Sequence, residues 1–124
     1  MRKYNIKLFL PDSLEHLKIA SNHSNFYDSN VPPDIDFLLC LGGDGTLIAG
    51  VRIFSNPTVP VLGVHIGGLG FLAQITPKEL TEKLNMIKNG QSTTQERLVL
   101  DAQISNSNKS HLLHRMNHLL LIDQ

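Results

Sequence analysis

Three glycines and one aspartate lie together at the end of an apolar stretch, in the run Leu41-Gly-Gly-Asp-Gly-Thr46. Glycines at this density let the backbone turn sharply and approach a ligand, because no Cβ atom stands in the way. They also leave backbone N–H groups free to face an anion, and a helix that starts here adds its positive end. A carboxylate at such a turn is well placed to accept a proton from a hydroxyl group under phosphoryl attack. The pattern therefore indicates a kinase acting on a hydroxyl, with Asp44 as general base.

The same turn has a simpler interpretation, in which Asp44 only caps the helix after a tight connection. The complete Gly-Gly-Asp-Gly-Thr run after a buried strand favours the functional interpretation over this one. The run is not a Walker A loop, because no Gly-Lys-Ser/Thr follows, and it lacks the spacing of the dinucleotide fingerprint. In the functional interpretation, phosphates lie against the backbone of Gly42, Gly43, Gly45 and Thr46.

A second glycine turn, Gly67-Gly-Leu-Gly70, is followed by Phe71. Two interpretations of it stay open. In one, Phe71 joins the core; in the other, the backbone closes over a ligand and the Phe71 ring stacks on a base. The histidines at 111, 114 and 118 do not predict a metal site, because on a strand 114 and 118 lie roughly 13 Å apart. Cys40, within an apolar run, is interpreted as an inert core thiol.

The hydrophobic pattern predicts alternating strands and helices that position these turns. A strand at 6–10 is expected in the centre of the sheet, a helix follows Asp12, and residues 21–35 are expected to form a loop. Strands at 36–41 and 59–65 then alternate with two helices. The helix at 46–54 is expected to be largely buried, with Leu47, Val51 and Phe54 on one face. The second helix begins at Thr76-Pro-Lys-Glu79 and ends at Asn89-Gly90, and Leu80, Leu84 and Ile87 form its inner stripe. The last elements are antiparallel strands at 97–104 and 112–122.

This order predicts an α/β fold with a doubly wound, mostly parallel sheet, in which residues 1–95 form a nucleotide-binding domain. The hairpin at 96–124 then begins a second, all-β domain that is truncated. In open α/β sheets, ligands bind outside the carboxyl ends of the strands. Both glycine turns fall at that edge, which indicates one shared site.

Composition excludes several other classes of protein. The 124 residues hold 11 basic and 11 acidic side chains, so no basic field attracts nucleic acid or a membrane. No apolar run approaches the ~20 residues of a membrane span. The single cysteine fits a reducing cytoplasm. A cytoplasmic enzyme that binds small molecules is the class these counts allow.

Three blocks together resemble the NAD kinase family, in the order and spacing of that family: Phe37-Leu-Leu-Cys-Leu-Gly-Gly-Asp-Gly-Thr-Leu47, Pro60-Val-Leu-Gly-Val-His-Ile-Gly-Gly-Leu-Gly-Phe-Leu72 and Glu96-Arg-Leu-Val-Leu100. The resemblance implies transfer of the γ-phosphate of ATP, or of a phosphate from polyphosphate, to the 2′-hydroxyl of NAD, with Mg²⁺, to form NADP. It also implies a homo-oligomer for the full-length proteins of the family.

By position, the resemblance gives each site residue a role. Asp44 matches the proton acceptor and an NAD contact, Gly45 a second NAD contact, and Phe71 the aromatic residue beside the adenine. Asn117 and His118 match the Asn-Glu pair that holds the dinucleotide, with His118 in place of the glutamate. Two further departures are His65 where asparagine is usual and Gly68 where arginine is usual.

The family has a second, all-β domain, and the chain is expected to hold only the first domain and the start of the second. This suggests a truncated or split gene product that carries the kinase signature and has little activity by itself. Two alternatives remain open. One is a non-catalytic nucleotide-binding fragment or subunit, and the other is a lipid kinase of the diacylglycerol type, which shares the first glycine turn.

Overall fold

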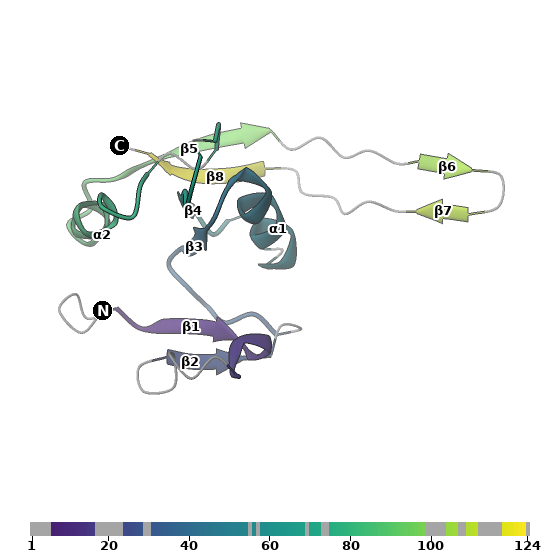
Figure 1. Cartoon of the computed structure of the whole chain (residues 1–124), viewed down its shortest axis with the longest axis horizontal. Coiled ribbons are helices and arrows are strands. Elements are labelled where there is room, and N and C mark those ends of the chain that lie inside the picture. The colour runs from purple at the N-terminus through teal and green to yellow at the C-terminus, as the bar shows by residue number, and fades with distance from the viewer. Residues whose placement is uncertain are drawn as a thin grey trace.

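The computed structural model describes residues 6–16, 24–28, 31–54, 56, 58–68, 70–72, 75–98, 104–106, 109–111 and 118–123. Its strands are β1 (Leu8–Pro11), β2 (Ser24–Tyr27), β3 (Leu38–Leu41), β4 (Val61–Val64), β5 (Thr93–Leu98), β6 (Ile104–Asn106), β7 (Lys109–His111) and β8 (His118–Asp123). Its α-helices are α1 (Asp44–Phe54) and α2 (Leu80–Lys88), and a short 3-10 helix covers Asp12–Leu14 (Figure 1).

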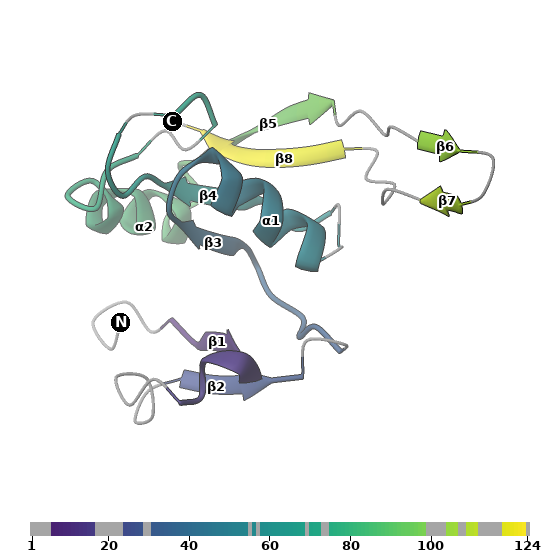
Figure 2. The same cartoon turned by 45° about the vertical axis from the view of Figure 1, so that its right-hand side comes forward.

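A four-stranded sheet in the order β3-β4-β8-β5 organises most of these elements (Figure 2). β3 and β4 pair in parallel, with Leu41 opposite Val64 at their carboxyl ends. β4 and β8 also run parallel, with Val61 opposite Leu121, whereas β5 pairs with β8 antiparallel. The predicted α/β class with a mostly parallel sheet is therefore confirmed.

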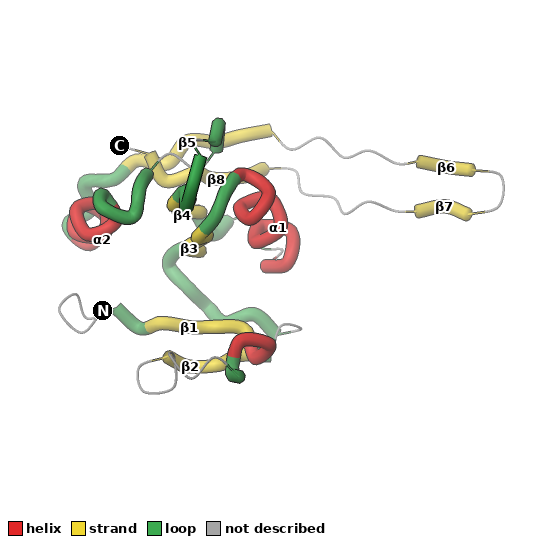
Figure 3. Tube along the Cα trace, viewed as in Figure 1, coloured by secondary structure: helices red, strands yellow, loops and turns green. Residues whose placement is uncertain are grey.

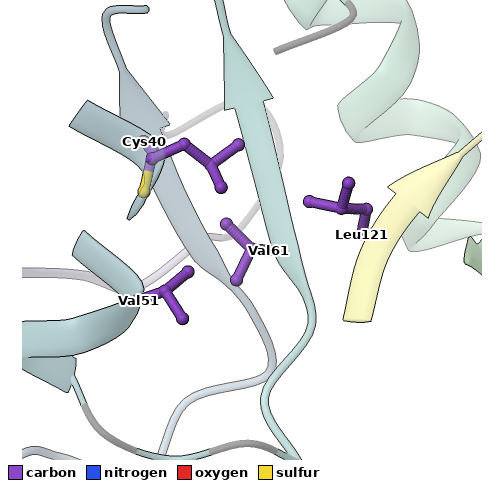
Figure 4. Packing of buried hydrophobic residues seen from close by; sticks show 5 residues of the cluster. Cys40, Val51, Val61 and Leu121 are labelled. Atoms are coloured by element: carbon purple, nitrogen blue, oxygen red, sulfur yellow. The ribbon is translucent and has the colours of Figure 1, made fainter. Parts of the chain in front are cut away.

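The two helices cover opposite faces of this sheet, as the positions of α1 and α2 on either side of β3 and β4 show (Figure 1). Side chains alternate between the two faces of a strand, so successive residues pack into two separate cores, one on each side of the sheet. The core on the α1 side contains Cys40, Leu47, Val51, Val61 and Leu121, whose labelled members point toward one another (Figure 4). The core on the other side contains Leu62, Val64, Ile75 and Ile122.

Helix α1 buries one stripe and exposes the other. Leu47, Val51 and Phe54 are buried, which confirms the predicted inner face. Ile48 and Ile53 are 57% and 60% exposed, so the prediction that this helix is largely buried is wrong. The reason is that the sheet covers only one side of a helix packed on it. No helix in the described segments has the length and apolar composition needed to cross a membrane.

Helix α2 ends where the sequence predicts, but it begins at Leu80, three residues later than the expected start after Thr76. The backbone N–H and the hydroxyl of Thr76 both donate to Glu79 Oε2 at 2.7 Å, in a turn that leads into the helix. At the other end, Gly90 has a φ of 67°, a conformation that favours glycine after a helix. The predicted inner stripe is confirmed: Leu84 is buried, and the second core is flanked by Leu80 and Ile87.

The amino-terminal part departs from the prediction. β1 pairs in parallel with β2 in a separate two-stranded sheet (Figure 3), so the prediction of a central first strand is wrong. Residues 24–27, expected in a loop, form β2. The helix expected after Asp12 is a short 3-10 helix, and Leu17, its second apolar residue, lies outside the described residues. β2 forms through its pairing with β1, and the residues Ser24-Asn-Phe-Tyr27 show no local alternation of apolar side chains that would predict a strand.

The predicted carboxyl-terminal hairpin is confirmed in its antiparallel pairing but not in its bounds. β5 begins at Thr93, four residues before the expected strand, and pairs with β8 from Thr93–Asp123 to Leu98–His118. β6 and β7 extend the hairpin, with Ile104 opposite His111, so pairing continues into the expected turn. The expected domain boundary at 95 falls inside β5, and β8 lies between β4 and β5 in the main sheet. A second domain beyond this hairpin stays a prediction.

Candidate functional site

The structure brings the two glycine turns together at the carboxyl ends of β3 and β4. Gly42, the first residue after β3, donates its N–H to the carbonyl of Val64 at 2.9 Å. Ile66, two residues after β4, donates back to the carbonyl of Gly42 at 3.2 Å. The parallel pairing of the strands thus continues into the turns. Both glycine-rich segments therefore lie at one edge of the sheet, where α/β proteins bind ligands.

The first turn leads directly into α1. A Cβ atom on Gly42 would collide with the side chain of Thr46, so this position requires glycine. The N–H groups of Thr46 and Leu47 both donate to the carbonyl of Gly43, at 3.0 and 3.2 Å. Since the amides of Gly42 and Thr46 are used inside the protein, an anion at this turn depends on the exposed backbone of Gly43 and Gly45. The positive end of the helix dipole lies at the same place.

Asp44, the first residue of α1, is half-buried and reaches the second glycine turn. Its Oδ2 accepts the N–H of Phe71 at 2.8 Å, and its Oδ1 accepts the N–H of Leu72 at 2.9 Å. Hydrogen bonds to an ionised acceptor are stronger than neutral ones. The carboxylate therefore does more than cap its own helix, which was the simpler interpretation of the sequence. Sequence spacing gave no signal for this contact, because its partners lie 27 and 28 residues away.

Phe71 is 94% exposed, so the interpretation that it joins the core is wrong. Its neighbour Leu72 packs against the first core instead. The hydrogen bond from the Phe71 N–H to Asp44 holds the backbone of Phe71 in place, while its ring stays accessible to solvent. An accessible aromatic ring beside a glycine turn is a suitable surface for a planar group.

His65 follows β4 between the two turns. Its N–H donates to the carbonyl of Ile75 at 2.9 Å, and its Nδ1 is buried with no hydrogen-bond partner among the described residues. His65 lies near enough to Glu79 to influence the pKa of its carboxyl group. The pKa of Glu79 is lowered chiefly by the hydrogen bonds from Thr76, and the charge of His65 acts in the same direction while the little desolvation present opposes it.

Of the two remaining predicted dinucleotide contacts, Asn117 and His118, the structure describes only His118. Asn117 lies outside the described residues. His118 is the first residue of β8, which runs parallel to β4 with Leu121 opposite Val61. His118 therefore lies three residues before Leu121, the residue paired with Val61, whereas the glycine turns lie beyond Val61 in the opposite direction along the sheet. A separation of six strand positions corresponds to about 20 Å along the sheet.

Cys40, His111 and His118, which the sequence analysis considered as possible reactive or metal-binding residues, all lie in strands. Cys40 is 6% exposed in β3, and burial raises its pKa to about 11, as expected of an inert core thiol. His111 belongs to β7 and His118 to β8, while His114 lies outside the described residues. In the part of the chain that the structure describes, no three His, Cys, Asp or Glu side chains gather as metal ligands.

The fold and the site together define a class: an α/β domain whose carboxyl strand ends carry two joined glycine turns, one with a carboxylate at a helix start. Comparison with known proteins assigns the family. Residues 6–92 match the ATP-NAD kinase N-terminal domain. The chain belongs to this family.

Curated relatives agree with that assignment. The chain is 30% identical over 116 residues to an NAD kinase of Syntrophobacter fumaroxidans, which covers 94% of this chain and 40% of the relative. It is 34% identical over 114 residues to an NAD kinase of Citrifermentans bemidjiense, with coverage of 89% and 40%. The chain thus spans about 40% of the length of these relatives.

A solved structure shows the same fold. The crystal structure of yeast NADH kinase complexed with NADH superposes with a TM-score of 0.70 at 21% identity. The match covers 91% of this chain and 37% of that one. It extends beyond residue 92 and so includes part of the hairpin that follows the family domain.

Proposed function

We propose that this chain carries the proton-accepting part of an NAD kinase site, which transfers the γ-phosphate of ATP to the 2′-hydroxyl of NAD and forms NADP. The observation that carries the proposal is the contact between Asp44 and the Phe71–Leu72 backbone. It joins a carboxylate at a helix start to an exposed aromatic ring, within a chain of the ATP-NAD kinase family.

In this reaction, the 2′-oxygen of the ribose attacks the γ-phosphorus, and the bond from that phosphorus to the β–γ bridging oxygen breaks. ADP leaves with the bonding electron pair, and the hydroxyl proton passes to the Asp44 carboxylate. In the structure Oδ1 and Oδ2 of Asp44 accept the backbone N–H groups of Leu72 and Phe71, and a carboxylate is also able to accept a hydroxyl proton. The Phe71 ring stacks on the adenine, and the exposed backbone at Gly43 and Gly45 faces the phosphates.

Mg²⁺ enters this proposal as part of the nucleotide substrate, carried by its phosphates. The described residues offer no cluster of three His, Cys, Asp or Glu side chains to hold the ion independently. Asp44 and the glycine backbone fit a magnesium-bound phosphate chain in charge and in access. Polyphosphate presents the same chemistry, so the donor is ATP or polyphosphate.

A second candidate function is that of a non-catalytic nucleotide-binding fragment, which needs another chain or domain for turnover. Two observations favour it: the chain spans about 40% of its curated relatives, and His118 lies at the opposite end of the sheet from Asp44. If His118 holds the dinucleotide, it does so from a neighbouring subunit or from a different conformation. The family match favours both candidates over a lipid kinase.

The proposal is tested by NADP formation from NAD and MgATP with the purified 124-residue chain, beside Asp44→Asn. NADP formation that the substitution lowers by about 10²–10⁴-fold supports a general base at Asp44. NAD binding by calorimetry without turnover supports the second candidate. Neither binding nor turnover, in a chain shown to be folded by circular dichroism, contradicts both.

A further inference from the structure

The Asp44 contact is unusual because one side chain holds two consecutive backbone N–H groups of a distant turn. The distances of 2.8 and 2.9 Å are those of good charge-assisted hydrogen bonds. Phe71, which donates one of them, is 94% exposed, so its ring has little packing to fix its place. The bonds to Asp44 are therefore a strong local constraint on the backbone that carries the ring.

Gly70 makes this contact possible. A Cβ atom on Gly70 would collide with Oδ1 of Asp44 and lie 2.7 Å from its Cγ and 3.0 Å from its Oδ2. Gly68, two residues earlier in the same turn, has nothing within 4 Å of such an atom. The requirement for glycine at position 70 is therefore the approach of one carboxylate, and not the shape of the turn in general.

We propose that Asp44 is the positioning residue of the second glycine turn and that Gly70 is its matched partner. The charge of Asp44 sets the backbone conformation at Phe71 and Leu72, and Gly70 gives the carboxylate room to do so. The consequence for dinucleotide binding rests on the proposed function, because it requires that the Phe71 ring meets the adenine. The positioning itself does not depend on that function.

This second role changes how a substitution of Asp44 is interpreted. Asp44→Asn replaces one of the two accepting oxygens by an NH2 group, which cannot accept, so the amide that faces this group loses its bond. That variant therefore removes a proton acceptor and releases the turn together. Gly70→Ala separates the two roles, because it keeps the carboxylate but its Cβ atom prevents Asp44 from reaching the amides of Phe71 and Leu72. The colliding atoms are the far end of the Asp44 side chain, which can rotate away, so this variant is expected to fold.

Amide hydrogen exchange and amide proton shifts, measured by NMR on the full 124-residue chain, test the proposal. In the unsubstituted protein, we expect the Phe71 and Leu72 amide protons to resonate downfield and to exchange slowly for an exposed turn. Asp44→Asn and Gly70→Ala should each speed exchange at one or both amides by about tenfold or more. Gly68→Ala, the matched control, should leave both amides unchanged.

Rapid exchange at Phe71 and Leu72 in the unsubstituted protein would overturn the proposal without any variant. Unchanged protection of both amides in Gly70→Ala would overturn it as well. Because these measurements use no nucleotide, they are independent of the proposed function. A chain that forms no NADP but shows the protected amides would retain the positioning role and lose the kinase role.

Discussion

The two glycine turns lie side by side but are held in different ways. The first turn is fixed by backbone bonds, from Gly42 to Val64 and from Ile66 to Gly42, that continue the pairing of β3 and β4. The second turn is held by a side chain, through the two bonds to Asp44. A backbone ladder belongs to the fold, whereas a contact through one carboxylate can be broken without unfolding the sheet. We infer that the first turn is the rigid half of the site and the second the adjustable half.

Gly42→Ala should have the largest effect on stability. Its new Cβ atom meets the Oγ1, Cβ and Cγ2 atoms of Thr46, and a β-branched side chain in the first turn of a helix has little freedom to move. We expect a loss of about 3 kcal/mol in the free energy of unfolding, the upper part of the range for overpacking. Urea denaturation measures it.

Gly43→Ala is the matched control for that experiment, because nothing lies within 4 Å of a Cβ atom there. It should change the free energy of unfolding by no more than about 0.5 kcal/mol. If both variants lose the same free energy of unfolding, contact with Thr46 is not the reason why position 42 requires glycine.

Phe71→Ala should separate binding from stability at the adjustable turn. Since the ring is 94% exposed, its removal should change the free energy of unfolding by less than about 0.5 kcal/mol. If the ring stacks on the adenine, NAD affinity should fall by about 1–3 kcal/mol, the usual value of base–aromatic stacking. Calorimetry with NAD measures the second effect and thermal denaturation the first. Unchanged affinity would remove Phe71 from the site.

The smallest expected effect concerns Glu79. Its exposed carboxylate accepts hydrogen bonds from Thr76, three residues away, whereas the carboxylate of Asp44 accepts from amides that are distant in the sequence. The hydrogen bonds from Thr76 lower the pKa of Glu79, so the folded state binds its proton less readily than the unfolded chain. Its contribution to stability is therefore present above the unfolded pKa and is lost as the pH falls through the folded pKa.

Denaturation at several acidic pH values tests this assignment. Glu79→Gln should make stability less dependent on pH in that range than it is in the unsubstituted chain. Glu82→Gln removes a neighbouring carboxylate of the same charge from α2 and serves as the control. An equal flattening by both variants would mean that overall charge, and not the bonds from Thr76, accounts for the dependence.

The sequence alone predicted the parts of the fold that depend on local patterns. The stripe Leu47, Val51 and Phe54 predicted α1, the apolar run at 59–65 predicted β4, and the start signal at Thr76 predicted α2, each within a few residues of the observed element. It failed for β2, because parallel pairing with β1 joins segments about 16 residues apart and leaves no period in the strand itself.

The candidate site divides in the same way. The edge of the sheet where it lies follows from the order of the elements, and the glycines of the first turn were visible as a motif. The contact between Asp44 and the amides of Phe71 and Leu72 was not, because a hydrogen bond to backbone leaves no residue type at its other end to recognise. Gly70 was visible only as part of the second glycine turn, and its partner Asp44 could not be predicted from the sequence.

The central claim is that the two turns form one dinucleotide site, and titration with NAD followed by amide NMR tests it most directly. We predict that the amides of Gly43 and Gly45 in the first turn and of Phe71 in the second shift together and saturate at one dissociation constant. Shifts confined to one turn, or two different dissociation constants, would contradict a shared site. No shift at either turn in a folded chain would contradict dinucleotide binding at this edge of the sheet.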